Sequence, residues 1–145
     1  MDIIPAIDII NGSCVRLLKG DYKKKTTYSN HPVQVALDWV SKGVNRIHIV
    51  DLEGARLGRR IEVESVQNIV ANVPVPIQLG GGIRSIDSVM QAIDQGVDRV
   101  MIGTAAINKN LIKTSIHFIQ IDIARNKQIR WHFFFVKVLN FFSID

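Results

Sequence analysis

Short runs of apolar residues alternate along the chain with longer segments in which apolar residues recur every three or four positions. A near-continuous apolar run is typical of a strand buried on both faces, whereas the longer period is typical of a helix with one buried side. Strands that alternate with helices predict an α/β fold with a parallel sheet and right-handed crossovers. The predicted strands are residues 3–7, 46–50, 75–79 and 99–102, and the predicted helices are residues 33–40, 63–73 and 86–93.

The ends of the predicted helices carry recognisable signals. Pro32 suits a first helical turn, and Ser85 is placed to cap the helix that follows it. Gly43 and Gly96 each close a helix, and a strand begins three residues later. The segments that begin at these two glycines match at glycine, valine, arginine and the last isoleucine. Such an internal repeat predicts a (β/α)8 barrel, although a doubly wound sheet would also show it.

The connection from residue 9 to residue 30 is unusually long. It holds a short alternating strand over residues 14–18, after the turn signal Asn11-Gly12, and then a polar stretch over residues 20–28. Long ordered loops at the carboxyl ends of parallel strands usually cover ligands. We therefore expect this segment to be a lid.

Composition and charge narrow the class of protein. With 145 residues, 47% of them hydrophobic and 21% charged, the chain is long enough for one ordinary core. No apolar run approaches the ~20 residues of a membrane helix, and the start lacks the features of a signal peptide, so we expect a cytoplasmic protein without membrane contact. Cys14 is the single cysteine, and we interpret it as a packed strand residue. The net charge of +5 suits an anionic ligand, but residues 23–25 form the only basic run, so nucleic acid binding is not favoured.

Glycines follow two neighbouring strands of the predicted sheet. One strand runs straight into Gly80, Gly81 and Gly82, and the next ends in Gly103 and Thr104. Backbone N–H groups freed of side chains can surround one anion, and phosphate is the commonest anion to need that. A tight turn with positive φ is the alternative, but one glycine would satisfy it. The sequence therefore predicts a site for a phosphorylated small molecule.

Several charged or titratable residues are candidates for chemistry. Asp8 ends the first predicted strand, where it could act as a general acid or base or simply cap a loop. For Asp51 we favour a structural role, because backbone amides follow it closely. Arg16 and Arg84 can each hold a carboxylate or a phosphate, although arginines are often only solvated at the surface. His48 is interpreted as packed within a strand, and no cluster with zinc-like spacing exists, so no metal site is predicted.

The motifs that hold these residues closely resemble one enzyme family, the isomerases of histidine biosynthesis that act on phosphoribosylformimino-aminoimidazole carboxamide ribotide. The similar segments are residues 3–8, 15–17, 20–22, 48–52, 78–84 and 102–106. The resemblance implies a (β/α)8 barrel and an Amadori rearrangement of an aminoaldose to an aminoketose, with a phosphorylated ribotide as substrate and no cofactor. It divides the chain into residues 1–111, the N-terminal half of a barrel, and residues 112–145, a divergent segment.

The resemblance also implies a role for each matching residue. Asp8 matches the general base that removes a proton from C2 of the opened ribose. A second carboxylate is needed on the opposite side, and the resemblance takes it from a fifth strand. Residues 121–126 look like that strand with one extra isoleucine, which makes Asp122 the candidate. The phosphate site would be formed by Gly81, Gly82, Gly103 and Thr104, with Arg16 and Arg84 in contact with substrate.

The length of the chain limits what it can build. A (β/α)8 barrel needs ~200 residues or more, so this chain supplies about half of one, four to five β/α units. Half a barrel exposes two open sheet edges and the apolar faces that should line a closed interior. We therefore expect homodimerisation through these edges, or misfolding. The chain is interpreted as a truncated isomerase with little or no turnover.

Three alternatives remain open at this point. The sister cyclase of the same pathway ranks lower, because its first loop usually resembles Val-Val-Lys-Gly rather than residues 15–20. A non-catalytic phosphate-binding half-barrel module would bind sugar phosphates without turnover. Nucleic acid binding through the basic charge would give a steeply salt-dependent affinity for DNA.

Overall fold

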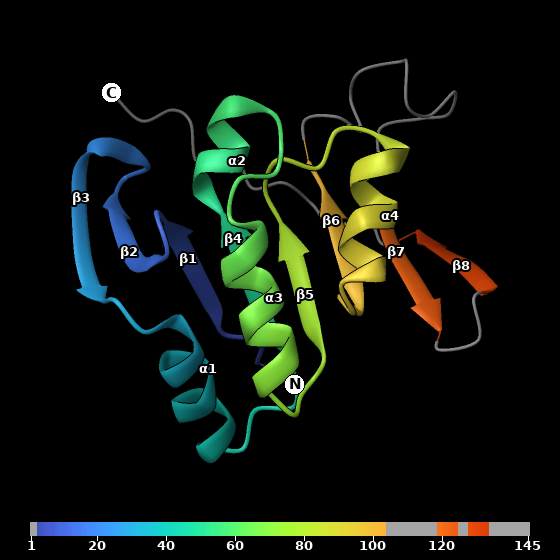
Figure 1. Ribbon diagram of the computed structural model, residues 1–145, viewed down its shortest axis with the longest axis horizontal. Helices are drawn as coiled ribbons and strands as arrows, with labels where there is room; N and C mark the ends of the chain where they lie inside the picture. The colour runs from blue at the N-terminus through green and yellow to red at the C-terminus, as the bar shows by residue number, and fades with distance from the viewer. Residues whose placement is uncertain (1–2, 104–118, 125–127, 134–145) are drawn as a thin grey trace.

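A computed structural model describes residues 3–103, 119–124 and 128–133, which form one sheet of eight strands with four helices (Figure 1). The strand order is β3-β2-β1-β4-β5-β6-β7-β8. The strands are β1 Ala6–Ile10, β2 Ser13–Leu18, β3 Asp21–Ser29, β4 Ile47–Asp51, β5 Ile77–Gly80, β6 Arg99–Ile102, β7 Ile119–Ala124 and β8 Gln128–Phe133. The helices are α1 Pro32–Ser41, α2 Leu52–Leu57, α3 Val63–Asn72 and α4 Ile86–Asp94.

Four parallel strands, β1, β4, β5 and β6, form the centre of the sheet, and α1, α3 and α4 cover one of its faces (Figure 1). Alternate residues of these strands are buried beneath the helices, which is where the core lies. The largest fully buried side chains are Ile7, Ile9, Ile47, Ile49, Val66, Ile69, Leu79 and Val100. The expected alternation of strands and helices is confirmed, and the fold is a partial (β/α)8 barrel whose sheet is open in the described part of the chain.

The helix ends follow the sequence signals. Pro32 occupies the first turn of α1. Ser85 caps α4, where its side chain accepts a hydrogen bond from the Ser88 backbone N–H at 3.1 Å. Gly43 and Gly96 take positive φ values of 85° and 89° directly after α1 and α4, a conformation that favours glycine. Local signals therefore set where these helices begin and end.

The first strand extends further than predicted. β1 continues to Ile10 because it turns directly into β2, with Asp8 opposite Val15. Asp8 therefore lies inside a strand and does not end one. On its other side it pairs with Val50, which in turn pairs with Gly80, the last residue of β5. Asp8 thus remains close to the carboxyl-end rim of the parallel strands.

The polar segment expected to form a lid is instead part of the sheet. It folds as β3, which pairs with β2 antiparallel and extends the sheet beyond β1. Nearly all of its residues are exposed, including the lysines at positions 23–25. Lysines on an edge strand discourage pairing with another chain, so the basic run has a structural explanation.

The segment that resembles a fifth parallel strand runs the other way. β7 pairs with β6 antiparallel, and Asp122 lies opposite Arg99, the first residue of β6. This register places the backbone of Asp122 at the amino-end rim, across the sheet from Gly103. The backbone of Asp122, the candidate for the second carboxylate, is therefore not at the rim that holds Asp8, because reversing a strand moves its residues to the opposite rim.

Antiparallel strands also change the prediction of two open edges. β2 and β3 extend the sheet beyond β1, and β7 and β8 extend it beyond β6. The two outer parallel strands, β1 and β6, are therefore not edge strands of the described sheet. The face opposite the helices is less apolar than expected. Its two rows of paired residues are Ala6, His48, Gln78 and Arg99, and then Asp8, Val50, Gly80 and Met101.

Candidate functional site

The predicted glycine site is brought together at the carboxyl-end rim. β5 and β6 are parallel neighbours, with Gly80 paired to Met101, so the residues after each strand meet. They line a cavity of about 130 Å³, which we call the rim cavity. Its lining residues are Ala55, Gly81, Gly82, Ile83, Arg84, Met101 and Gly103. Four of the predicted site residues therefore share one cavity, whereas Thr104 lies outside the described residues.

The structure gives Gly81 and Gly82 a reason to be glycine that involves no ligand. Both have positive φ, 95° and 72°. A Cβ at Gly81 would overlap the backbone carbonyl of Asp51, and one at Gly82 would overlap the backbone carbonyl of Arg59. The turn and its packing therefore require glycine at both positions. From the sequence, a turn was expected to require only one glycine. A Cβ at Gly103, by contrast, would meet open space.

Asp51 holds the loop on which these glycines pack. Its side chain is 2% exposed and accepts three backbone hydrogen bonds. The donors are the N–H groups of Gly54 at 2.6 Å, Ile61 at 2.7 Å and Glu62 at 3.0 Å. The first of these bonds caps α2, and the other two tie the start of α3 to the end of β4. The structural role predicted for Asp51 is confirmed.

Asp8 shares the rim and the sheet face of the rim cavity but does not line it. It lies in one row with Val50 and Gly80, two strands away from Gly80, or about 10 Å at ~4.8 Å per strand. Burial raises the pKa of Asp8, and the nearby Arg16 guanidinium on β2 lowers it in part. A carboxyl with a raised pKa is suited to proton transfer.

His48 lies one row further from the rim on the same face. Its Nδ1 is 3.1 Å from the side-chain nitrogen of Gln78, and burial lowers its pKa. This agrees with the interpretation of His48 as a packed residue. Cys14 is fully buried, as expected, and burial raises the pKa of its thiol to about 11.

Tyr22 was not identified as a site residue from the sequence, although residues 20–22 are one of the segments that resemble the isomerase family. Its hydroxyl donates a hydrogen bond to the backbone oxygen of Leu52 at 2.7 Å, and the Arg56 guanidinium lies 5.8 Å from its ring centre. These contacts fasten the start of β3 to α2. The β2–β3 hairpin is therefore held against the carboxyl-end rim, near Asp8 and Arg16.

Arg84 reaches across the rim to the same segment. Its Nη2 donates to the backbone oxygen of Ala55 at 3.2 Å, and its guanidinium lies against Gly58, where a Cβ would overlap it. Gly58 has a φ of 75° and ends α2. Arg84 therefore links the loop after β5 to the loop after β4.

We expect Asp8→Asn to increase the free energy of unfolding at pH 7, because asparagine carries no charge to bury. Burial raises the pKa of Asp8 in the folded state above 3.8. The stability that its bound proton contributes is therefore complete below the unfolded pKa and is lost as the pH rises through the folded pKa. The advantage of asparagine should be large at pH 7 and small near pH 4, as urea denaturation at both values would measure.

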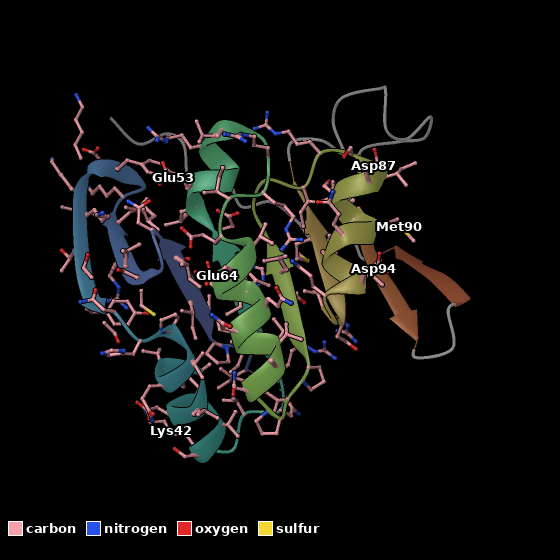
Figure 2. All side chains as sticks on the ribbon, in the orientation of Figure 1. Lys42, Glu53, Glu64, Asp87, Met90 and Asp94 are labelled. Atoms are coloured by element: carbon pink, nitrogen blue, oxygen red, sulfur yellow. The ribbon has the colours of Figure 1, made fainter. Side chains whose placement is uncertain are left out.

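Asp94→Asn serves as the matched control, since Asp94 is an exposed carboxylate on α4 (Figure 2). It should leave the unfolding midpoint nearly unchanged at either pH. A less stable Asp8→Asn protein at pH 7 would mean that attraction to Arg16 outweighs the cost of burial, contrary to our argument.

Comparison with known proteins identifies the family. The sequence profile of the family described as "Histidine biosynthesis protein" matches residues 2–128. The chain belongs to this family. The resemblance found in the motifs is confirmed, and with it the membership in a family of enzymes.

Curated relatives are named as 1-(5-phosphoribosyl)-5-((5-phosphoribosylamino)methylideneamino) imidazole-4-carboxamide isomerases. The protein from Gloeobacter violaceus is 52% identical over 114 residues, which are 78% of this chain and 45% of the relative. That from Halothermothrix orenii is 47% identical over 117 residues, 80% of this chain and 49% of the relative. That from Picosynechococcus is 43% identical over 116 residues, with shares of 80% and 45%. The chain spans about half the length of these relatives.

Neither a membrane-spanning helix nor a metal-binding cluster is found among the described residues. None of the described helices is both long enough and apolar enough to cross a membrane. Within the same residues, histidine, cysteine and acidic side chains form no group of three or more that could hold a metal ion.

Proposed function

We propose that this chain, which spans about half the length of its relatives, acts in histidine biosynthesis as an isomerase that binds a phosphoribosyl aminoaldose and, as this chain alone, turns it over slowly or not at all. The observation that supports binding is the rim cavity, where Gly81, Gly82 and Gly103 line one space with Arg84. Backbone N–H groups and a guanidinium are the donors that a phosphate group prefers. The names of the relatives, which contain two phosphoribosyl groups and the word isomerase, support the same ligand class.

In the proposed reaction Asp8 is the general base. Opening of the ribose ring gives a Schiff base at C1, which acidifies the C2–H bond, and the Asp8 carboxylate removes that proton. The C2–H electron pair forms the C1=C2 double bond of an enaminol, and the C1=N π pair moves onto nitrogen. Protonation of C1 and loss of the proton of the C2 hydroxyl then give the aminoketose. Asp8 lies about 10 Å from Gly80, the last residue before the phosphate site. A ribose phosphate that reaches from the rim cavity towards β1 could therefore bring its C2 near Asp8, with Arg16 beside it.

Low turnover is proposed because a second proton-transfer group is needed and the candidate is misplaced. Ring opening needs a proton donor on the far side of the sugar. The register of β7 puts the backbone of Asp122 at the other rim. The same observation favours the second candidate function, a non-catalytic phosphate-binding module.

Partners and location are proposed on simpler grounds. The chain spans about half the length of its relatives, and the described helices α1, α3 and α4 leave the opposite face of the sheet uncovered (Figure 1), so we propose a homodimer in which a second copy covers this face. We also propose a cytoplasmic protein with no nucleic acid partner, since protection of the sheet edge accounts for the lysines at positions 23–25.

Gly103→Val tests the binding proposal. The fold has room for side-chain atoms at this position, yet they would fill space in the rim cavity. With ribose 5-phosphate as the probe in calorimetric titrations, we expect the affinity to fall by roughly tenfold or more, the equivalent of one lost charge-assisted hydrogen bond. The thermal midpoint should stay the same.

Gly43→Ala is the control, because Gly43 lies far from the rim and has no atom within 4 Å of an added Cβ. It should bind the probe as the unchanged protein does. A chain that binds no ribose 5-phosphate, or a Gly103→Val protein that binds it equally well, would refute the proposal. Conversion of the aminoaldose by the unchanged chain, lost in Asp8→Asn, would refute only the claim of low turnover.

A further inference from the structure

A second cavity opens on the outer side of the loop that follows β5. Its volume is about 380 Å³, and we call it the outer cavity. It is lined by Gly58, Arg59, Arg60, Val63, Gly82, Arg84, Ser85, Asp87, Ser88 and Gln91. Its volume falls within the ~300–1,000 Å³ range of small-molecule sites. Gly82 and Arg84 border both cavities, and the other lining residues of the outer cavity come from the loop after α2, from the first residue of α3, and from α4 with its N-cap.

The outer cavity carries an excess of positive charge. Three guanidinium groups line it, from Arg59, Arg60 and Arg84, against one carboxylate, Asp87. Within the part of the chain that the structure describes, ion pairs join Arg46 to Asp98, Arg56 to Glu53 and Arg99 to Asp98. None of the three arginines of the cavity is in these pairs, although the buried Asp51 carboxylate attracts the Arg60 guanidinium electrostatically. Like charges around one cavity favour an anion between them.

The hydrogen bonds of these three arginines also leave room for an anionic ligand. Arg60 Nη2 donates to the Gln95 side-chain oxygen at 2.6 Å, while its buried Nη1 has no hydrogen-bond acceptor among the described residues. Arg84 donates to a backbone oxygen, and Arg59 is exposed. The exposed Arg59 guanidinium is thus the accessible donor of the cavity, and its strongest acceptors would be the oxygens of an anion. The buried Arg60 Nη1 contributes positive charge without facing the ligand.

The start of α4 adds backbone donors. This helix has nine residues, and Ser85 and Ser88 form its capping box. The capping bond satisfies the N–H of Ser88, whereas the N–H groups of Ile86 and Asp87 precede the first intrahelical bonds. A helix N-terminus is electrostatically favourable for an anion. Here it adds to the three guanidinium groups.

We propose that the outer cavity is a second anion site, which takes the phosphate group of a small phosphorylated molecule. Arg59 and Arg84 bind the phosphate oxygens from the loop side, and the first amides of α4 bind them from the helix side. Asp87 opposes the ligand and limits its affinity. Arg84 borders both cavities, but Arg59 and the α4 amides line only the outer cavity, so these donors distinguish the outer site from the rim cavity.

The test is a titration of isotope-labelled chain with inorganic phosphate, followed by amide NMR signals. The amides of Ile86 and Asp87 should shift in a saturable way. Arg59→Gln should weaken the binding seen at these amides by roughly fivefold or more, and Asp87→Asn should strengthen it. Lys42→Gln removes the same charge as Arg59→Gln at the far end of α1 (Figure 2) and should have no effect.

The outcomes separate this site from the rim cavity. Shifts confined to Gly81 and Gly103, which line only the rim cavity, would support the rim cavity and overturn the outer site. Equal weakening by Arg59→Gln and Lys42→Gln would also overturn it, because general attraction by net charge would then be enough. Shifts at the α4 amides with none at Gly81 and Gly103 would support the outer site and count against the proposed function.

Discussion

Gly81→Ala is expected to lower the free energy of unfolding by about 3 kcal/mol or more. The positive φ of Gly81, 95°, costs a residue with a side chain about 1–2 kcal/mol. The added methyl group would also overlap the Asp51 carbonyl, and such overpacking costs about 1–3 kcal/mol. Backbone at this point cannot move aside easily, because Asp51 is the last residue of β4. Urea denaturation followed by circular dichroism would measure the loss.

Substitutions at two other glycines distinguish the cost of backbone strain from the cost of steric overlap. Gly43 has a similar φ of 85° but no atom within 4 Å of an added Cβ, so Gly43→Ala should cost only the conformational part, about 1–2 kcal/mol. The added Cβ of Gly103→Ala would meet open space, so this substitution should lower the free energy of unfolding least of the three. Equal losses for Gly81→Ala and Gly43→Ala would show that the contact with Asp51 does not matter. A stable Gly81→Ala protein would contradict the structure of the turn itself.

The parts of the fold that were predicted correctly are determined by residues that lie close together in the sequence. The central strands and the three long helices each show one clear period, and Pro32, Ser85 and Gly96 mark helix ends within a few residues. Such signals depend on neighbours in the sequence, so they survive in a chain of about half the family length. The buried faces follow from them, since each apolar stripe needs a layer to cover it.

The parts that were predicted wrongly depend on partners that are distant in sequence. β3 is polar and exposed along nearly its whole length, so no period of two distinguishes it from a loop. The apolar residues of β7 indicate a strand but not its direction, and direction decides which rim receives Asp122. Tyr22 was overlooked as a contact for the same reason, because its acceptor, the oxygen of Leu52, belongs to α2, 30 residues away in the sequence.

The site illustrates how one residue type can serve two purposes. Sequence alone indicated that three successive glycines were too many for a turn, and the rim cavity agrees that strand ends converge there. The structure adds that Gly81 and Gly82 are already required by packing on Asp51 and Arg59. Gly103 has no such requirement, which makes it the most informative position for testing a ligand.

Asp51→Ala is expected to lower the free energy of unfolding by about 3 kcal/mol or more, since three backbone donors would lose their acceptor at about 1–3 kcal/mol each where they stay buried. The donors are Gly54, Ile61 and Glu62. The free energy of unfolding of Asp51→Asn should lie between those of the unchanged protein and Asp51→Ala. The asparagine amide oxygen can still accept from one donor, while its NH2 group faces another donor. Chemical denaturation of the three proteins at one pH measures the series.

Combining Asp51→Ala with Gly81→Ala shows whether the two residues act through one contact. The carbonyl that the new methyl group would overlap belongs to Asp51, the last residue of β4, and the Asp51 side chain ties this end of β4 to the start of α3. Once that side chain is gone, the end of β4 is held less firmly and can move away from the methyl group, so the double substitution should cost less than the sum of the single ones. Strict additivity would mean that the end of β4 is held by other contacts, and the support of the rim cavity would then have to be sought outside the Asp51 side chain.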